Sequence, residues 1–143
     1  KRINRYSLYR SINNLYKSKL IHSQENKDGT TSMVLSKDGK KKALRYHIDT
    51  IKIPGMKKWD KRWRIIVFDI PEKYKKARDA MALTLLKMGF HRLQKSVFVH
   101  PFECQNELDF VIEFWNVRPH VRTILAHHID NEFHIKTKFG ILD

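Results

Sequence analysis

The chain has 143 residues, 41% of them hydrophobic, which is enough for one ordinary domain or two small ones with packed cores. No run of about 18 apolar residues occurs, so a membrane-spanning helix is excluded, and the basic, polar start is unlike a signal peptide. The single cysteine, Cys104, excludes an intrachain disulfide and a cysteine-rich zinc site. We therefore expect a cytoplasmic, nucleoid-associated bacterial protein without a membrane partner.

The positive charge is concentrated in the first part of the chain. Lys and Arg number 29 against 15 Asp and Glu, which gives a formal charge of +14. Residues 1–58 hold 15 basic and 4 acidic side chains, whereas residues 59–143 hold 14 and 11. A basic face of this density attracts polyanions, above all DNA or RNA. The alternative is a general solubilising charge, but solubility does not require one sign to gather in one segment.

Residues 3–20 carry apolar side chains at a helical period and are predicted to form a helix. Its other face holds Arg and Asn, which suit guanine and adenine edges in the major groove, together with Lys for phosphates. Residues 20–24 and 31–35 are predicted to form a hairpin that turns at Asp28-Gly29. The candidate DNA-binding residues are Arg2, Arg5, Arg10, Asn13, Asn14, Lys17 and Lys19 on the helix, and Lys27 at the hairpin tip.

Ser36 is expected to cap a second helix over residues 37–46. The order helix, two-stranded wing, helix is that of a winged helix-turn-helix from its recognition helix onward. This interpretation assigns residues 1–50 to a winged-helix DNA-binding domain, with one or two helices expected before Lys1. Residues 51–61 lack a clean period and are predicted to form a linker.

The remainder, residues 62–143, is predicted to be a ferredoxin-like module of order βαββαβ, which makes the whole chain α+β. Residues 132–136 are considered as an additional strand. The expected strands are 62–70, 90–94, 96–101 and 121–129, and the expected helices are 72–88 and 104–116. Trp63 and Trp115 lie on apolar stripes and are expected in the core, with Trp59 beside the linker.

Two stretches of this module carry a family resemblance: WRIIVFDIPEKYKKARD from Trp63, and LLKMGFHRLQKSVFVHPFEC up to Cys104. They resemble the CRISPR-associated Cas-two family and, more closely, the Cas-two-like central domain of PaaX-type transcriptional regulators. The matching marks are Asp69-Ile70-Pro71 after a hydrophobic strand, a basic helix, Gly89, and the run QKSVF at 94–98. The resemblance covers roughly residues 60–130.

This resemblance implies a ferredoxin-like fold, a homodimer through these modules and a link to duplex DNA. A two-fold dimer would present two recognition helices to two half-sites, so a palindromic operator is expected. PaaX-type regulators respond to an aryl-CoA thioester and carry a further C-terminal domain. This sequence ends at Asp143 without such a domain, and we do not extend that effector to it.

Asp69 is the candidate catalytic and metal-binding residue. In Cas-two nucleases the matching aspartate, with its dimer mate, is proposed to hold Mg²⁺ for phosphodiester hydrolysis, and the resemblance implies this role for Asp69. The alternative is a strand-end residue that caps the turn before Pro71 or pairs with a basic side chain. A metal site at His127 and His128 is disfavoured, because adjacent residues point to opposite faces of a strand. No cofactor is expected, except Mg²⁺ if the chain is a nuclease.

The sequence thus predicts a double-stranded-DNA-binding homodimer, a transcriptional regulator of PaaX type without enzymatic activity. One alternative is a divergent CRISPR-associated Cas-two protein, either a Mg²⁺-dependent endonuclease or a scaffold for spacer integration. Another is a protein-interaction adaptor of antitoxin type. The basic start of the helix at 72–88 fits either a second DNA track or a solvated face.

Overall fold

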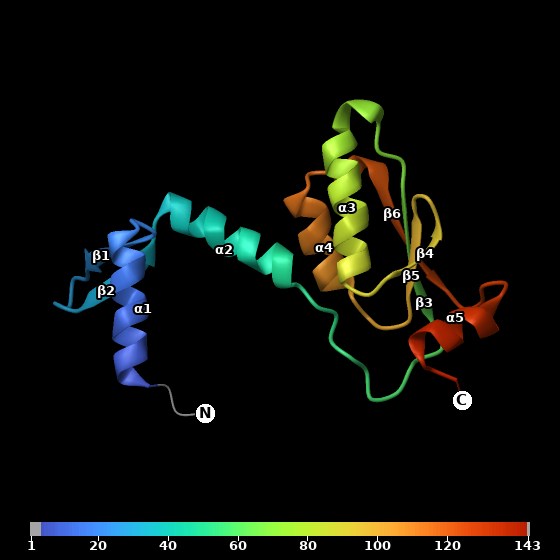
Figure 1. Ribbon diagram of the computed structural model, residues 1–143, viewed down its shortest axis with the longest axis horizontal. Coiled ribbons are helices and arrows are strands. Elements are labelled where there is room, and N and C mark those ends of the chain that lie inside the picture. The colour runs from blue at the N-terminus through green and yellow to red at the C-terminus, as the bar shows by residue number, and fades with distance from the viewer. Residues whose placement is uncertain (1–3, 143) are drawn as a thin grey trace. The chain divides into compact units, whose positions relative to one another are not determined.

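A computed structural model of the protein describes residues 4–142 and consists of two compact units, one ending at Asp49 and the other beginning at Thr50 (Figure 1). The first unit contains the basic segment. The second contains the stretches that resemble the Cas-two family. Each unit has its own sheet, so the elements of each are described separately.

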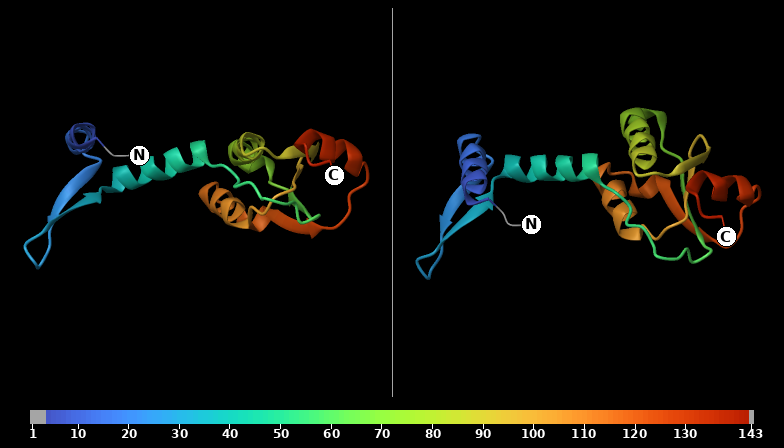
Figure 2. Two further views of the ribbon diagram at one scale, coloured as in Figure 1. Left: turned by 90° about the horizontal axis from the view of Figure 1, so that it is seen from below. Right: turned by 60° about the horizontal axis from the view of Figure 1, so that its bottom comes forward.

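The first unit follows the predicted order of helix, hairpin and helix. Its elements are α1 (Arg5–Lys17), β1 (Ile21–Glu25), β2 (Thr31–Leu35) and α2 (Lys37–Thr50). The strands pair antiparallel with Ile21 opposite Leu35, and the hairpin projects away from α1 as a ribbon (Figure 2). Compared with the prediction, α1 is shorter at both ends and α2 continues four residues further.

The end of α1 is fixed by a left-handed residue. Lys19 has φ of 58°, its N–H donates to the Tyr16 carbonyl, and the Leu20 N–H donates to the Leu15 carbonyl at 3.0 Å. These are the hydrogen bonds of a Schellman ending, which turns the chain directly into β1. The position usually takes glycine, because a Cβ makes the left-handed region unfavourable.

The start of α2 is held by the predicted cap. The Ser36 hydroxyl accepts a hydrogen bond from the Gly39 N–H at 3.0 Å and lies 2.8 Å from the Lys19 carbonyl, to which it donates. Glycine is required at position 39, because a Cβ there would lie 2.0 Å from the backbone oxygen of Leu20. The N-terminus of α2 and the start of β1 are thus in direct backbone contact.

The second unit has the ferredoxin-like order βαββαβ, followed by one more helix. Its sheet has the order β4-β5-β3-β6, and every neighbouring pair is antiparallel. The elements are β3 (Trp63–Phe68), a 3-10 turn (Glu72–Tyr74), α3 (Lys75–Lys87), β4 (His91–Gln94), β5 (Val97–His100), α4 (Gln105–Phe114), a 3-10 turn (Arg118–His120), β6 (Val121–Ala126) and α5 (Glu132–Phe139).

Apolar side chains on both faces of β3 explain its central position in the sheet. The helices α3 and α4 cover one face of the sheet (Figure 1). Ile66 and Phe68 alternate with the β3 residues of the other face and are buried, as are Met81, Leu85 and Leu108 of the two helices. On the other face a second cluster joins Trp63 of β3, Val99 of β5 and Ile135 of α5. A strand buried on both faces is what a continuous apolar run predicts.

The strand considered for residues 132–136 is wrong, because these residues form the start of α5. Asn131 and Gly140, both left-handed, bound the helix. Within it, Glu132 and Lys136 pair at 3.5 Å, four residues apart on one face. Glu132 also accepts a hydrogen bond from the Trp63 indole N–H at 2.8 Å, a contact that only the folded sheet provides.

Three smaller expectations of the second unit have different outcomes. The prediction placed His127 and His128 on opposite faces of a strand over residues 121–129. This is wrong, because β6 ends at Ala126 and both histidines follow it. Trp63 is fully buried as expected, whereas Trp115 is only half-buried and donates its indole N–H to Thr84 at 3.2 Å. Trp59 packs on Trp63, with ring centroids 4.8 Å apart.

Candidate nucleic-acid interface

Helix α1 begins at a capping residue that fixes its direction. The Asn4 side chain accepts a hydrogen bond from the Tyr6 N–H at 3.0 Å, so the start of the helix is defined by its own sequence. No acidic residue lies in its first turn. The helix N-terminus therefore keeps its partial positive charge, which favours a nearby phosphate.

Four of the predicted DNA-binding residues lie together along one side of α1. Each residue advances about 100° around a helix, so positions 10, 13, 14 and 17 fall within an arc of roughly 100°. All four side chains are exposed. We call this set the polar stripe; its members are Arg10, Asn13, Asn14 and Lys17.

The other predicted residues of the first unit are not part of the polar stripe. Arg5 lies about 130° around α1 from the centre of the polar stripe, on the side of Ile12. Lys19 follows the helix in the left-handed turn. Arg2 lies outside the described residues. Tyr6, which the sequence prediction did not select, is on the stripe side and is 78% exposed. The spacing 6, 10, 13, 17 in the sequence is the signal that identifies it.

The opposite side of α1 borders an apolar groove within the same unit. A hollow of about 290 Å³ is lined mainly by apolar side chains and contains no acidic residue. Its lining residues are Leu15, Leu20, Leu35, Gly39, Lys42, Ala43 and Tyr46. This side of α1 is turned toward the hairpin and α2, so the polar stripe is the side that is free for a ligand.

The wing tip is held by local hydrogen bonds and carries little net charge. The Asp28 carboxylate accepts hydrogen bonds from the Thr30 N–H at 3.0 Å and from the Thr30 hydroxyl, and these bonds hold the pKa of Asp28 below its ordinary value. Gly29 takes the left-handed conformation with φ of 82°. Lys27 is exposed at this tip, but the acidic side chains of Glu25 and Asp28 flank it. Lys27 thus adds little net positive charge to the wing.

Helix α2 carries a second group of cations that the sequence prediction did not assign to the site. They are exposed and follow one another closely along the helix. Arg45 is within 3.7 Å of Asp49, a pair in which both side chains are more than half exposed. The group consists of Lys37, Lys40, Lys41, Lys42 and Arg45. The run of three lysines in the sequence is the signal for them.

The surrounding residues of Asp69 do not form a metal site. Its carboxylate is exposed at the end of β3, and its N–H donates to the His120 carbonyl at 2.9 Å. A hollow of about 310 Å³ next to it is also lined by His120 and Arg122. Within residues 4–142, no group of three or more His, Cys, Asp or Glu side chains is placed to hold a metal ion. The guanidinium of Arg122 further disfavours a cation there.

The basic side chains at the start of α3 have local partners. Arg78 lies 3.0 Å from Glu72, and Lys75 lies 4.0 Å from Asp79. The ammonium group of Lys73 lies 5.0 Å from the centroid of the Tyr74 ring. These contacts agree better with a solvated face than with a second DNA track.

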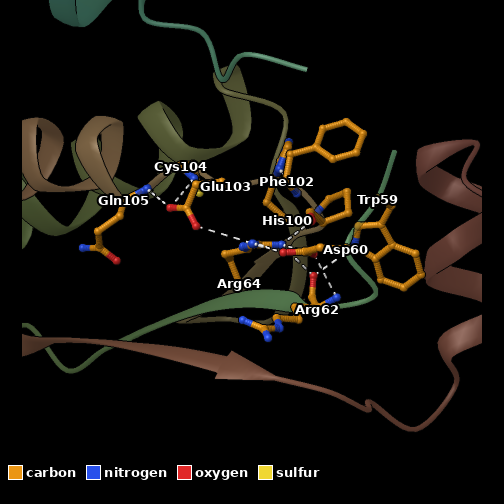
Figure 3. A network of polar contacts seen from close by, with 10 residues as sticks. Trp59, Asp60, Arg62, Arg64, His100, Phe102, Glu103, Cys104 and Gln105 are labelled. Atoms are coloured by element: carbon orange, nitrogen blue, oxygen red, sulfur yellow. Dashed lines mark hydrogen bonds and ion pairs between the residues drawn. The ribbon is translucent and has the colours of Figure 1, made fainter. Parts of the chain in front are cut away.

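A buried arginine ties the segment before β3 to the far end of β5 (Figure 3). Arg64 donates to both carboxylate oxygens of Asp60 at 2.7 and 2.6 Å, and to the Pro101 carbonyl at 2.7 Å. Glu103 lies 3.4 Å away on the same side. The hydrogen bond from Arg64 lowers the pKa of Asp60. This network is structural, because the Arg64 side chain that joins its members is buried.

Two further titratable groups are buried near this network. Burial lowers the pKa of His100 to about 4, and its Nδ1 accepts a hydrogen bond from the Phe102 N–H at 3.1 Å. Burial raises the pKa of the Cys104 thiol to about 12. His100 is therefore neutral near pH 7, and Cys104 is an unreactive packing residue.

Comparisons with known proteins identify the second unit. In the described part of the chain, no helix has the length and apolar character needed to cross a membrane. A search of the curated proteins gives no match. The family model of the PaaX protein central Cas2-like domain matches residues 56–136, which is more than half of the chain and includes all four strands of the second sheet. The chain therefore belongs to the PaaX family, and its second unit is the family's central Cas2-like domain.

Proposed function

We propose that this protein is a sequence-specific regulator of transcription that binds double-stranded DNA as a homodimer through its ferredoxin-like units. The polar stripe of α1 is the observation that carries the proposal. It combines one Arg and two Asn, which recognise guanine and adenine edges, with one Lys for the phosphate backbone. Membership of the PaaX family supports the same function.

In this proposal α1 is the recognition helix of a winged helix-turn-helix and lies in the major groove. Arg10, Asn13 and Asn14 read base edges, and Lys17 contacts phosphate. Arg2, Arg5, Lys19 and Lys27 are not members of the polar stripe, and in this proposal they add at most contacts with the phosphate backbone. The lysines of α2 add attraction for the polyanion that does not depend on sequence. Two copies read two half-sites roughly 34 Å apart if these lie one helical turn from each other.

The test is selection from a random duplex library over a salt series, in the presence of Mg²⁺, with the DNA checked for cleavage. We expect an enriched palindrome, intact DNA and an affinity that falls with salt by a slope of about −0.9 per phosphate contact. Binding without any enriched motif would contradict sequence-specific regulation. Cleavage that requires both Mg²⁺ and Asp69 would identify a nuclease instead.

The nuclease alternative rests on Asp69 alone. The carboxylate is exposed and forms no side-chain hydrogen bond or ion pair with the described residues, so it is free to take a ligand. Mg²⁺ needs several oxygen ligands, and one chain supplies a single carboxylate next to the cation of Arg122. These residues do not fit a metal centre, and we derive no catalytic step from them.

A further inference from the structure

The two edges of the second sheet differ sharply in their protection against strand addition. The β4 edge is four residues long, has a register irregularity between Arg92 and Gln94, and ends beside Lys95. Bulges, short length and basic side chains are the usual devices that keep a sheet edge from pairing. The β6 edge has six residues in unbroken register with β3 and a single charged side chain, Arg122.

The outer strand β6 also exposes large apolar side chains on both of its faces. Ile124 is 48% exposed on the face that α5 partly covers, and Leu125 is 53% exposed on the face of α3 and α4. An edge strand that is regular, long and apolar on both faces is unfavourable in water unless another strand pairs with it. The sequence places such a strand only at this edge of the sheet.

Hydrogen bonds at the end of β3 show which backbone groups of β6 face outward. The Asp69 N–H donates to the His120 carbonyl, while the Phe68 N–H turns away to the Ser96 carbonyl. Hydrogen-bonded and non-hydrogen-bonded pairs alternate along an antiparallel ladder. The outward N–H and C=O groups therefore belong to Val121, Thr123 and Leu125.

We propose that β6 pairs antiparallel with β6 of a second copy, with the two-fold axis at Thr123. This inference rests on the homodimer of the proposed function and specifies its interface. With a two-fold axis perpendicular to the sheet at Thr123, Thr123 opposes its own copy and Val121 opposes Leu125 of the partner. All three residues have outward N–H and C=O groups, so these groups can form hydrogen bonds between the two strands. Two four-stranded sheets then form one continuous sheet of eight strands.

The resulting side-chain pairs are complementary. Val121 of one copy opposes Leu125 of the other, which joins the apolar surface on the face of α3 and α4. On the second face Arg122 opposes Ile124, so the two guanidinium groups do not face each other and each aliphatic stem covers an apolar side chain. The Arg122 guanidinium, which donates to the Val121 carbonyl at 2.9 Å in the single chain, must give up this bond to the partner strand.

The pairing also has a consequence for Asp69. Asp69 lies opposite His120, three residues from the axis, so the two copies of Asp69 lie about 20 Å apart along the strands. Two carboxylates at this separation cannot share one Mg²⁺ ion. The β6 dimer is thus compatible with a regulator and incompatible with a metal centre formed by the two Asp69 residues.

The test uses two variants of β6 and one matched control. Leu125→Lys places a charge at the interface, and Thr123→Pro removes an outward N–H without removing a bond to β3. Leu83→Lys on α3 is the control, because Leu83 is 54% exposed and lies away from the edge. Sedimentation equilibrium of the full chain measures the dimer, and circular dichroism verifies that each variant is folded.

We expect a dimer in the wild type and in Leu83→Lys, and at least tenfold weaker association in both β6 variants. A monomeric wild type, or a folded β6 variant that keeps wild-type association, would overturn the pairing. If one variant fails to fold, Thr123→Cys provides a second measurement. Its sulfur atoms should cross-link through a short bismaleimide, whereas Arg92→Cys on the β4 edge should not. Equal cross-linking at both edges would also overturn the pairing.

Binding of the same preparations to duplex DNA tests the proposed function separately. A dimer that depends on β6 but does not bind duplex DNA supports the pairing and contradicts the regulator. A monomer that still binds a specific duplex overturns the pairing and the homodimer, but it leaves sequence-specific DNA binding by the first unit intact.

Discussion

The buried His100 should make the stability of the second unit depend on pH. Its pKa is lowered to about 4 by burial, so folding favours the neutral imidazole. Because the folded pKa lies below the ordinary value of 6.5, the contribution to stability is complete above pH 6.5 and is lost as the pH falls toward 4. The loss should reach up to about 3 kcal/mol, and urea unfolding followed by tryptophan fluorescence at pH 7 and pH 4.5 measures it.

His100→Phe should remove most of this dependence, because the side chain no longer titrates. The variant forfeits the hydrogen bond from the Phe102 N–H, so its stability at pH 7 should be lower by about 1 kcal/mol. His91, whose pKa is also lowered by burial, provides the comparison through His91→Phe. If His100→Phe loses as much stability as the wild type between pH 7 and pH 4.5, the imidazole is not the group responsible.

Arg64 is the residue whose loss should destabilise the second unit most directly. Arg64→Met removes the donor to the Pro101 carbonyl and leaves Asp60 with only the hydrogen bond from the Arg62 N–H, and we expect a cost of about 2–3 kcal/mol. The lowered pKa of Asp60 means that the ion pair contributes above the ordinary pKa of 3.8 and is lost as the pH falls below it.

The control for Arg64 is Arg62→Met, which removes the same charge from an exposed neighbouring position. Chemical denaturation at pH 7 should show little change for Arg62→Met and a clear drop in the midpoint for Arg64→Met. Equal midpoints for the two variants would mean that the buried network does not stabilise the unit. Neither residue belongs to the proposed DNA-binding surface.

At the scale of elements, the polar stripe makes separate predictions for base contacts and phosphate contacts. Arg10→Ala should weaken binding to the selected palindrome by about 1–3 kcal/mol per half-site and relax the preference at one base position. Lys17→Ala should weaken binding to all sequences alike and reduce the salt slope by about 1 per half-site. Quantitative titration of single-base operator variants at two salt concentrations distinguishes the two effects.

Asp79→Ala and Asp69→Ala are suitable controls for the polar stripe, since both lie in the second unit. Neither should change the affinity or the preferred sequence. A larger effect of Asp69→Ala than of Arg10→Ala would contradict α1 as the recognition helix. It would instead favour a role of the second unit in contact with DNA.

The turn between α1 and β1 holds a residue that is unfavourable for the fold. Lys19 has φ of 58°, a conformation that costs a residue with a Cβ roughly 1 kcal/mol. Lys19→Gly should therefore slow hydrogen exchange of the Leu20 amide, which donates to Leu15, by several-fold. If Lys19 contacts DNA as proposed, the same variant should bind duplex DNA more weakly despite the firmer turn. Lys19→Asn also removes the charge, but asparagine tolerates the left-handed conformation. Comparing its DNA affinity with that of Lys19→Gly therefore distinguishes the effect of charge from the effect of backbone strain.

Most elements could be predicted from the sequence, because their signals are local. The apolar run of β3, the helical stripe of α3 and the Asp-Gly turn between β1 and β2 each follow from neighbouring residues alone. The helix α5 could not be predicted in this way, because its apolar residues are few and its contact with Trp63 depends on the folded sheet. Arg64 was missed for the same reason, since its partners lie up to 39 residues away.

The candidate site was predicted less completely than the fold. The sequence indicates which residue types suit DNA, and the basic half of the chain indicates where to look. It does not show which of these side chains share a face, because the helix boundaries and the packed side must first be known. Once α1 is defined, Arg5 separates from the polar stripe and Tyr6 joins the same side.

For the whole molecule, dimerisation and DNA recognition should be coupled through avidity. Two linked half-site contacts bind a palindrome more tightly than either contact alone, by a factor on the order of 10²–10⁴ when the geometry allows both. Leu125→Lys should therefore lower the affinity for the full palindrome toward that for a single half-site. It should leave the affinity for an isolated half-site unchanged, because β6 lies outside the first unit. Leu83→Lys should alter neither affinity, and fluorescence anisotropy with duplexes of both kinds measures the difference. A Leu125→Lys protein that keeps the full affinity for the palindrome would show that DNA recognition by the first unit does not depend on pairing through the second sheet.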